Sequence, residues 1–156
     1  MDELWAAIQA LPPAQWLRDV SLAYILVNAA HIASLGLLVG CIVTLDLRLL
    51  GAFASVPLPP LWTVLSRMAA AGLMLVALTG LWLFSVNAEQ YAHNRAFQLK
   101  LGLLALAVAN AALLHWRMRP RSGPGSQPNS GTKLQAAASI ALWLSVLLAG
   151  RWIGFA

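Results

Sequence analysis

Long apolar stretches alternate with short polar segments along this chain of 156 residues. Each stretch has about 20 residues or more, the length that an α-helix needs to cross the hydrocarbon of a bilayer. The pattern predicts four membrane-spanning helices, over residues 22–50, 61–86, 97–116 and 134–155. None of the four contains a proline, so nothing in them interrupts a helix. We therefore expect an all-α, integral membrane four-helix bundle.

Four connecting segments separate or precede these stretches: residues 1–20, 51–60, 87–95 and 118–133. The first has a short amphipathic pattern interrupted by Pro12 and Pro13, and we expect an N-terminal interfacial segment along the membrane surface. The next two predict loops, since the second segment holds three prolines and the third is polar. The last is rich in Pro, Gly and Ser, which is typical of a flexible linker. Residues 21–156 are thus expected to form a single four-span membrane domain.

Composition supports this assignment. The chain is 60% hydrophobic and only 10% charged, whereas soluble domains carry about 25% charged residues. The net charge of +5 does not indicate nucleic-acid binding, because the basic residues lie at the ends of apolar stretches and form no aromatic-interleaved patch. The single cysteine, Cys41, excludes a disulfide framework within the chain. The lipid bilayer is therefore the expected partner.

The Lys and Arg residues are unequally divided between the two predicted sides of the membrane. The side opposite the chain ends holds Arg48, Arg67, Arg117, Arg119, Arg121 and Lys133, and the side of the chain ends holds Arg18, Arg95, Lys100 and Arg151. Positively charged loops remain in the cytoplasm. We therefore expect a multi-pass protein of the plasma membrane with both termini outside the cytoplasm.

Polar residues at the predicted outer depth form the outer layer, defined as Asn28, His31, Lys100 and Arg151. A rise of about 1.5 Å per residue brings His31, Lys100 and Arg151 to similar depth, and Asn28 lies about 60° from His31 around its helix. Ionisable groups within the hydrocarbon usually face the bundle interior. Two cations beside a histidine would suit a heme propionate, a quinone oxygen or a small anion. Alternatively, the cations extend to the headgroups and His31 bonds to a neighbouring helix.

Polar residues at the opposite depth form the inner layer, defined as Asp46, Arg48, Arg67 and His115. Asp46 projects about 60° from His31, toward the same interior side of the first span. It is placed to form an ionic clasp with Arg67 or His115, which would set helix register. The alternative is a proton relay, since Asp and His within spans recur in such relays.

Metal and heme sites need suitable ligands at one depth. A copper site would combine His31 with Met74 or His93, although methionines more often serve packing. Cys41 lies about 15 Å from His31 along the helix, so one ion cannot contact both. His31 and His115 lie toward opposite membrane faces, so a heme with two histidine ligands would need His93 folded back into the bundle.

Sequence motifs for catalysis are missing: there is no nucleophile elbow, phosphate loop, His-Glu-x-x-His or Cys-x-x-Cys. Whether the chain is an enzyme is uncertain, and the pattern favours a protein that is not. Gly36 and Gly40 form a Gly-x-x-x-Gly pattern that permits close helix approach. We expect it to serve packing inside the bundle, with a dimer contact as the alternative.

Three segments carry a resemblance to a known family. His31–Gly40 reads HIASLGLLVG, residues 96–117 read AFQLKLGLLALAVANAALLHWR, and residues 46–51 read DLRLLG. With the terminal Gly-Arg-Trp-Ile, these resemble a bacterial family of four-span membrane proteins, distantly similar to the core of the copper-resistance protein D family. The resemblance covers residues 24–152 and departs at Leu38, where a tryptophan is expected. It implies a bacterial inner-membrane location, His31 as a ligand or polar hub, and Lys100 in the same site.

Three functions follow as hypotheses. The first is a membrane protein that handles copper or binds heme through His31. The second is a non-catalytic membrane subunit or assembly partner, in a homo- or hetero-oligomer held by its membrane helices. The third is a proton- or solute-coupled transporter that uses Asp46 and His115.

Overall fold

The computed structural model describes residues 2–118 and 129–153, and within them the chain forms seven α-helices and no strand. These are α1 (Asp2–Gln9), α2 (Pro12–Asp19), α3 (Ser21–Leu50), α4 (Leu58–Val86), α5 (Ala88–His93), α6 (Arg95–Arg117) and α7 (Ser130–Trp152). In the part of the chain so described, α3, α4, α6 and α7 are long and apolar enough to cross a membrane. The predicted all-α four-helix architecture is confirmed, and it is that of a multi-pass membrane protein.

Two predicted loops are partly helical. Pro59 and Pro60, expected in a loop, lie in the first turn of α4, where a residue needs no amide proton for the helix. Polar residues 87–95, also expected as a loop, contain the short helix α5. A proline is excluded from the middle of a helix but fits its first turn. A polar segment can still form a short helix at the surface.

Asparagine caps make two spans begin earlier than predicted. Asn94 Oδ1 accepts hydrogen bonds from the amides of Ala96 and Phe97, at 2.8 and 3.1 Å, so α6 begins at Arg95. Asn129 Oδ1 accepts from the Thr132 amide at 2.8 Å, so α7 begins within the predicted linker. Such side chains satisfy amides that have no partner in the helix. Residues 119–128 of that linker, and residues 154–155 of the predicted fourth span, lie outside the described residues.

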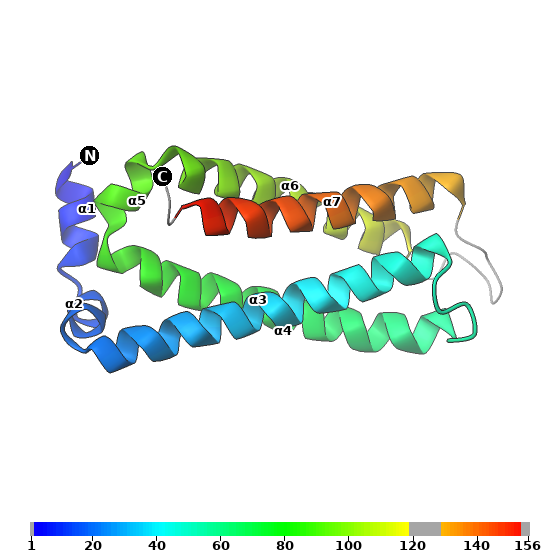
Figure 1. Ribbon diagram of the computed structural model, residues 1–156, viewed down its shortest axis with the longest axis horizontal. Coiled ribbons are helices and arrows are strands. Elements are labelled where there is room, and N and C mark those ends of the chain that lie inside the picture. Colours follow the sequence, from blue (N-terminus) through cyan, green and yellow to red (C-terminus); the bar gives the residue numbers. More distant parts are fainter. Residues whose placement is uncertain (1, 119–128, 154–156) are drawn as a thin grey trace.

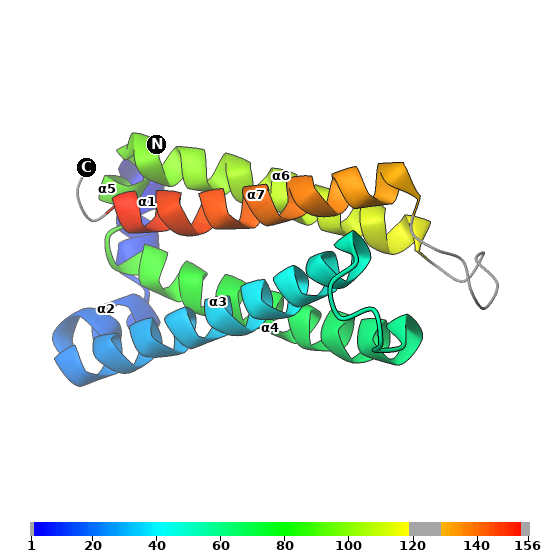
Figure 2. The same cartoon turned by 45° about the vertical axis from the view of Figure 1, so that its right-hand side comes forward.

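The four long helices form two antiparallel hairpins, α3 with α4 and α6 with α7, visible in Figures 1 and 2. The hairpins pack against each other through α3 and α7. No Cα of α4 comes within 8 Å of a Cα of α6. The bundle is therefore closed along α3 and α7 and spread apart along α4 and α6.

Glycines of α4 allow α3 and α4 to cross closely. A Cβ added at Gly72 would lie 3.0 Å from the Leu38 amide nitrogen, and one at Gly80 would lie 3.1 Å from His31 Cε1. A Cβ added at Gly36 or Gly40 would meet nothing within 4 Å. The expectation that Gly36 and Gly40 serve packing inside the bundle is wrong, because they lie on the outer face of α3.

The N-terminal segment covers one end of the bundle, where α1 runs across the ends of the long helices (Figure 1). Leu17 of α2 is fully buried there. Arg18 Nη2 donates to the Val86 carbonyl at 2.8 Å, and Trp82 Nε1 donates to the Pro13 carbonyl at 3.0 Å. We call α1 and α2 the end cap; α7 ends on the same side (Figure 1).

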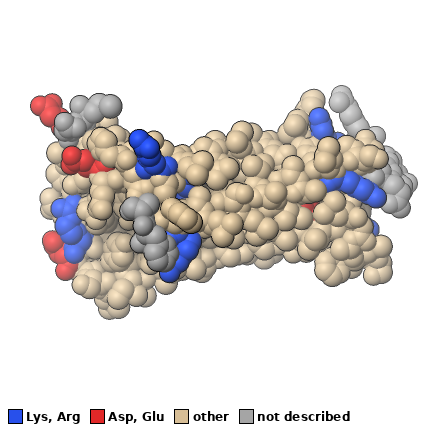
Figure 3. Space-filling view, turned by 45° about the horizontal axis from the view of Figure 1, so that its top comes forward, with Lys and Arg blue, Asp and Glu red and all other residues tan. Residues whose placement is uncertain are grey.

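Charged side chains gather toward the two ends of the molecule on the face shown in Figure 3. The length between them is covered by uncharged residues on that face. Exposed leucines are frequent on the long helices, among them Leu78, Leu106 and Leu148 at 63%, 59% and 72% exposure. Such a surface is stable against acyl chains and not against water.

Candidate functional site

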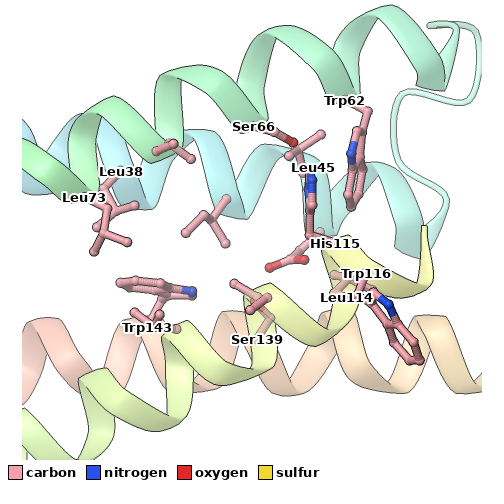
Figure 4. Close-up of a pocket in the computed structure, with 17 residues that line it drawn as sticks. Leu38, Leu45, Trp62, Ser66, Leu73, Leu114, His115, Trp116, Ser139 and Trp143 are labelled. Atoms are coloured by element: carbon pink, nitrogen blue, oxygen red, sulfur yellow. The ribbon is translucent and has the colours of Figure 1, made fainter. Parts of the chain in front are cut away.

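A cavity of about 390 Å³ lies between the two hairpins, and all four long helices line it (Figure 4). Its walls are mostly leucine, valine and alanine side chains. The polar and aromatic residues in its lining are Asp46, Trp62, Ser66, His115, Trp116, Ser139 and Trp143. Ligand sites typically combine an apolar wall with a few polar groups in this way. We call this space the hairpin cavity.

Asp46 is the acidic group of the hairpin cavity. It lies in the second-last turn of α3 and is 1% exposed, on the same face of the helix as the buried residues Leu45 and Leu49. Its Oδ2 has no hydrogen-bond partner. The ionic clasp is not formed, since Asp46 makes no ion pair with Arg67, which is exposed, or with His115. A buried polar oxygen without a partner costs about 1–3 kcal/mol.

Two residues of α7 add further unpartnered groups to the same cavity. Ser139 and Trp143 are four residues apart, so they share one face of the helix, and each is 1% exposed. Neither Ser139 Oγ nor Trp143 Nε1 has a hydrogen-bond partner. Ser139 is close enough to influence the Asp46 carboxyl, but the pair does not have the distance and angle of a hydrogen bond. In Figure 4 the Trp143 nitrogen lies on the side of the ring nearer Ser139.

Two pairs of stacked aromatic rings bridge the gap between α4 and α6, at two places along the helices. Trp62 and His115 stack with ring centroids 5.7 Å apart and an interplanar angle of 22°, as Figure 4 shows. Toward the end cap, Phe84 and Phe97 stack at 5.4 Å and 13°. Between these stacks the hairpin cavity reaches the surface, because Ala112 of α6 lines it and is also exposed.

The structure places His31 of the outer layer between α3 and α4, half-buried. Its Nδ1 lies 2.8 Å from Thr79 Oγ1. The Thr79 hydroxyl lies 2.6 Å from the Leu75 carbonyl, which can only accept, so the hydroxyl proton points there. Thr79 Oγ1 therefore accepts from His31 Nδ1–H, and Nε2 keeps its lone pair in the neutral ring.

The other outer-layer residues are divided between the interior and the surface. Lys100 extends from α6 over α7, where its Nζ would lie 3.4 Å from a Cβ at Gly150, and it acts electrostatically on His31. Asn28 and Arg151 are exposed. The structure thus brings Lys100 toward His31 and leaves Asn28 and Arg151 on the outside of the bundle.

Both residues named as copper partners of His31 are exposed. Met74 is 67% exposed. His93 is exposed, and its Nδ1 lies 2.9 Å from the Glu89 carbonyl of its own helix. Across residues 2–118 and 129–153, no three His, Cys, Asp or Glu side chains lie together as a metal site. Copper and heme binding stay predictions.

The remaining inner-layer residues serve separate structures. Arg48 Nε donates to the Val56 carbonyl at 2.9 Å, which holds the connection between α3 and α4. His115 lines the hairpin cavity but is exposed at its mouth. Ser139 and Trp143 were not predicted as site residues. The available signal was a serine four residues before a tryptophan in the fourth span, which also contains Gln135 and Ser145.

Comparison of the chain with family models, with curated proteins and with solved structures finds no match in any of the three. The resemblance to the bacterial four-span family therefore stays a prediction.

Proposed function

We propose that this membrane protein binds a small, largely apolar solute in the hairpin cavity. The supporting observation is that Asp46 Oδ2, Ser139 Oγ and Trp143 Nε1 are buried, lack partners and belong to residues lining one cavity. Buried polar groups in native proteins nearly always have partners. The three atoms have almost no accessible surface as the protein stands, so a solute that supplies their partners displaces the side chains that cover them. Binding at Asp46 and His115 is also what the solute-coupled transporter hypothesis requires.

The replacement Ala112→Phe is expected to abolish solute binding, because the larger side chain occupies the mouth of the hairpin cavity. Wild-type protein in detergent would be heated with indole, hexanol, hexylamine or hexanoate while its unfolding is followed. A solute at about 100 times its dissociation constant adds about 2.7 kcal/mol to the free energy of unfolding. Wild type should show this stabilisation with at least one solute, and Ala112→Phe should show none.

Ala105→Phe is the matched control, since Ala105 is exposed on the same helix and does not line the cavity. It should keep the wild-type response. A solute that stabilises wild type and Ala112→Phe equally would contradict the proposed site.

A second proposal concerns His31 as a ligand to heme or copper. It is supported by the hydrogen bond from His31 Nδ1 to Thr79, which leaves Nε2 to bind a metal. Histidine ligands generally donate their other nitrogen to an oriented acceptor in this way.

Under this second proposal, His31→Ala removes the bound cofactor while the protein still inserts and folds. Thr79→Val should weaken the cofactor by about 10–100-fold, because it removes the group that orients the ring. His115→Ala, in the other layer, should leave the cofactor in place. The measurements are the visible spectrum and the metal content of purified protein. A wild type with neither a Soret band nor copper after reconstitution would exclude the proposal.

A further inference from the structure

We propose that the solute of the hairpin cavity is a lipid-soluble, single-chain amine that enters from the bilayer between α4 and α6. The inference rests on the proposed function, since it names the chemical class bound at the same site. Three independent properties of the cavity support it: where it opens, where its polar groups lie, and which charges line it.

The cavity opens toward lipid. No Cα of α4 approaches one of α6 within 8 Å, although both helices belong to the membrane-spanning set. Ala70 of α4 and Ala112 of α6 line the cavity and are exposed, so the cavity is open where these two helices face each other. The Trp62–His115 and Phe84–Phe97 stacks bridge the two helices on either side of this opening. A molecule that enters sideways must therefore be soluble in the bilayer.

The cavity has a polar end and an apolar end. Asp46 lies near the end of α3, at the end of the cavity where Trp62 and His115 stack. Leu38 also lines the cavity, eight residues earlier in α3, so the lining extends about 12 Å toward the middle of the bundle. The deep end is lined by Leu38, Leu73 and the ring of Trp143, whose nitrogen lies on the side nearer Ser139 (Figure 4). This division matches an amphiphile with a polar head near the membrane surface and an apolar chain toward the midplane.

The charge of the lining favours a cation. Asp46 and His115 are the ionisable residues among the described lining, which includes no Lys or Arg. An isolated buried carboxylate at Asp46 is costly in a medium of low dielectric constant, so an anionic head beside it is disfavoured and an ammonium that compensates the charge is favoured. An ammonium can donate to the unpartnered Asp46 Oδ2.

The test compares three probes with the same chain length and different heads: decylammonium, decanol and decanoate. The full chain would be placed in phosphatidylcholine nanodiscs, and binding followed by tryptophan fluorescence after correction for partition into lipid. Decylammonium should bind wild type about tenfold more tightly than decanol, the ratio for one charge-assisted hydrogen bond. Decanoate should bind more weakly than decanol.

Asp46→Asn should remove the advantage of decylammonium over decanol while leaving the affinity for decanol within about twofold. Glu89→Gln is the charge-matched control, because Glu89 is an exposed acid on α5 outside the cavity. It should keep the wild-type ranking of the three probes.

Two results would overturn the amine assignment: equal binding of decanol and decylammonium by wild type, or an unchanged preference in Asp46→Asn. The wild-type ranking needs no variant, so it remains decisive if Asp46→Asn does not fold. If wild type binds all three probes alike and Ala112→Phe binds none of them, the proposed function stands and only the amine assignment fails. Binding of none of the three would overturn the amine assignment, and solute binding itself would then be decided by the separate Ala112→Phe series.

Discussion

Replacing Asp46 with leucine is expected to stabilise the ligand-free protein, by about 1–3 kcal/mol in the free energy of unfolding. The carboxylate is 1% exposed, and its Oδ2 has no partner. Burial of this polar group costs free energy that burial of a leucine does not, and the adjoining cavity has room for the slightly bulkier side chain. The same variant should lose the binding of any solute that the carboxylate recognises. Higher stability together with lost binding is typical of a residue retained for function.

Reversible unfolding in detergent, read by circular dichroism, measures the first effect, and the probe titrations measure the second. Ser139→Ala is the companion variant, since it removes another unpartnered polar atom from the same cavity. It should shift stability in the same direction by a smaller amount. If Asp46→Leu instead unfolds more easily than wild type, the carboxylate holds the helices together, as the predicted clasp would have required.

Replacing Gly72 with valine is expected to separate α3 from α4 and cost more than the roughly 1–3 kcal/mol that is typical of overpacking. A Cβ at Gly72 would lie 3.0 Å from the Leu38 amide nitrogen and 3.1 Å from its Cα. These are backbone atoms, so α3 itself must move. Leu38 lines the hairpin cavity, and solute binding should weaken together with stability.

Gly36→Ala is the matched control on α3, because a Cβ there meets nothing within 4 Å. It should leave stability unchanged or raise it by about 0.5–1 kcal/mol, the helix preference of alanine over glycine. Thermal unfolding in detergent and in nanodiscs would measure both variants. Loss of stability in Gly36→Ala as large as in Gly72→Val would show that the outer face of α3 is packed, as in the predicted oligomer.

The four spans were predictable because their evidence is local. Length and apolarity identify a membrane helix without any knowledge of its neighbours. The differences occurred at helix ends, where Asn94 and Asn129 accept amide hydrogen bonds and where Pro59 and Pro60 fit a first turn. Caps act over three or four residues, and hydrophobic runs do not reveal them.

The site was less predictable because it depends on which helices become neighbours. Depth alone made Arg67 and His115 candidate partners for Asp46. The structure instead packs α3 against α7, so the side chain that approaches Asp46 is Ser139 of α7. Nothing in the spacing of residues along one helix says which of the other three will lie beside it.

The contact of α3 with α7 has a mechanical consequence. Among the four long helices, the hairpins meet by close backbone approach along α3 and α7, while on the opposite side the Trp62–His115 and Phe84–Phe97 stacks bridge α4 and α6. A small rotation of one hairpin about that line changes the width of the opposite side without disturbing the interior of either. The width of the opening between α4 and α6 thus depends on this angle and on the two aromatic stacks that bridge it, and a residue altered on α3 or α7 can change the angle from across the bundle.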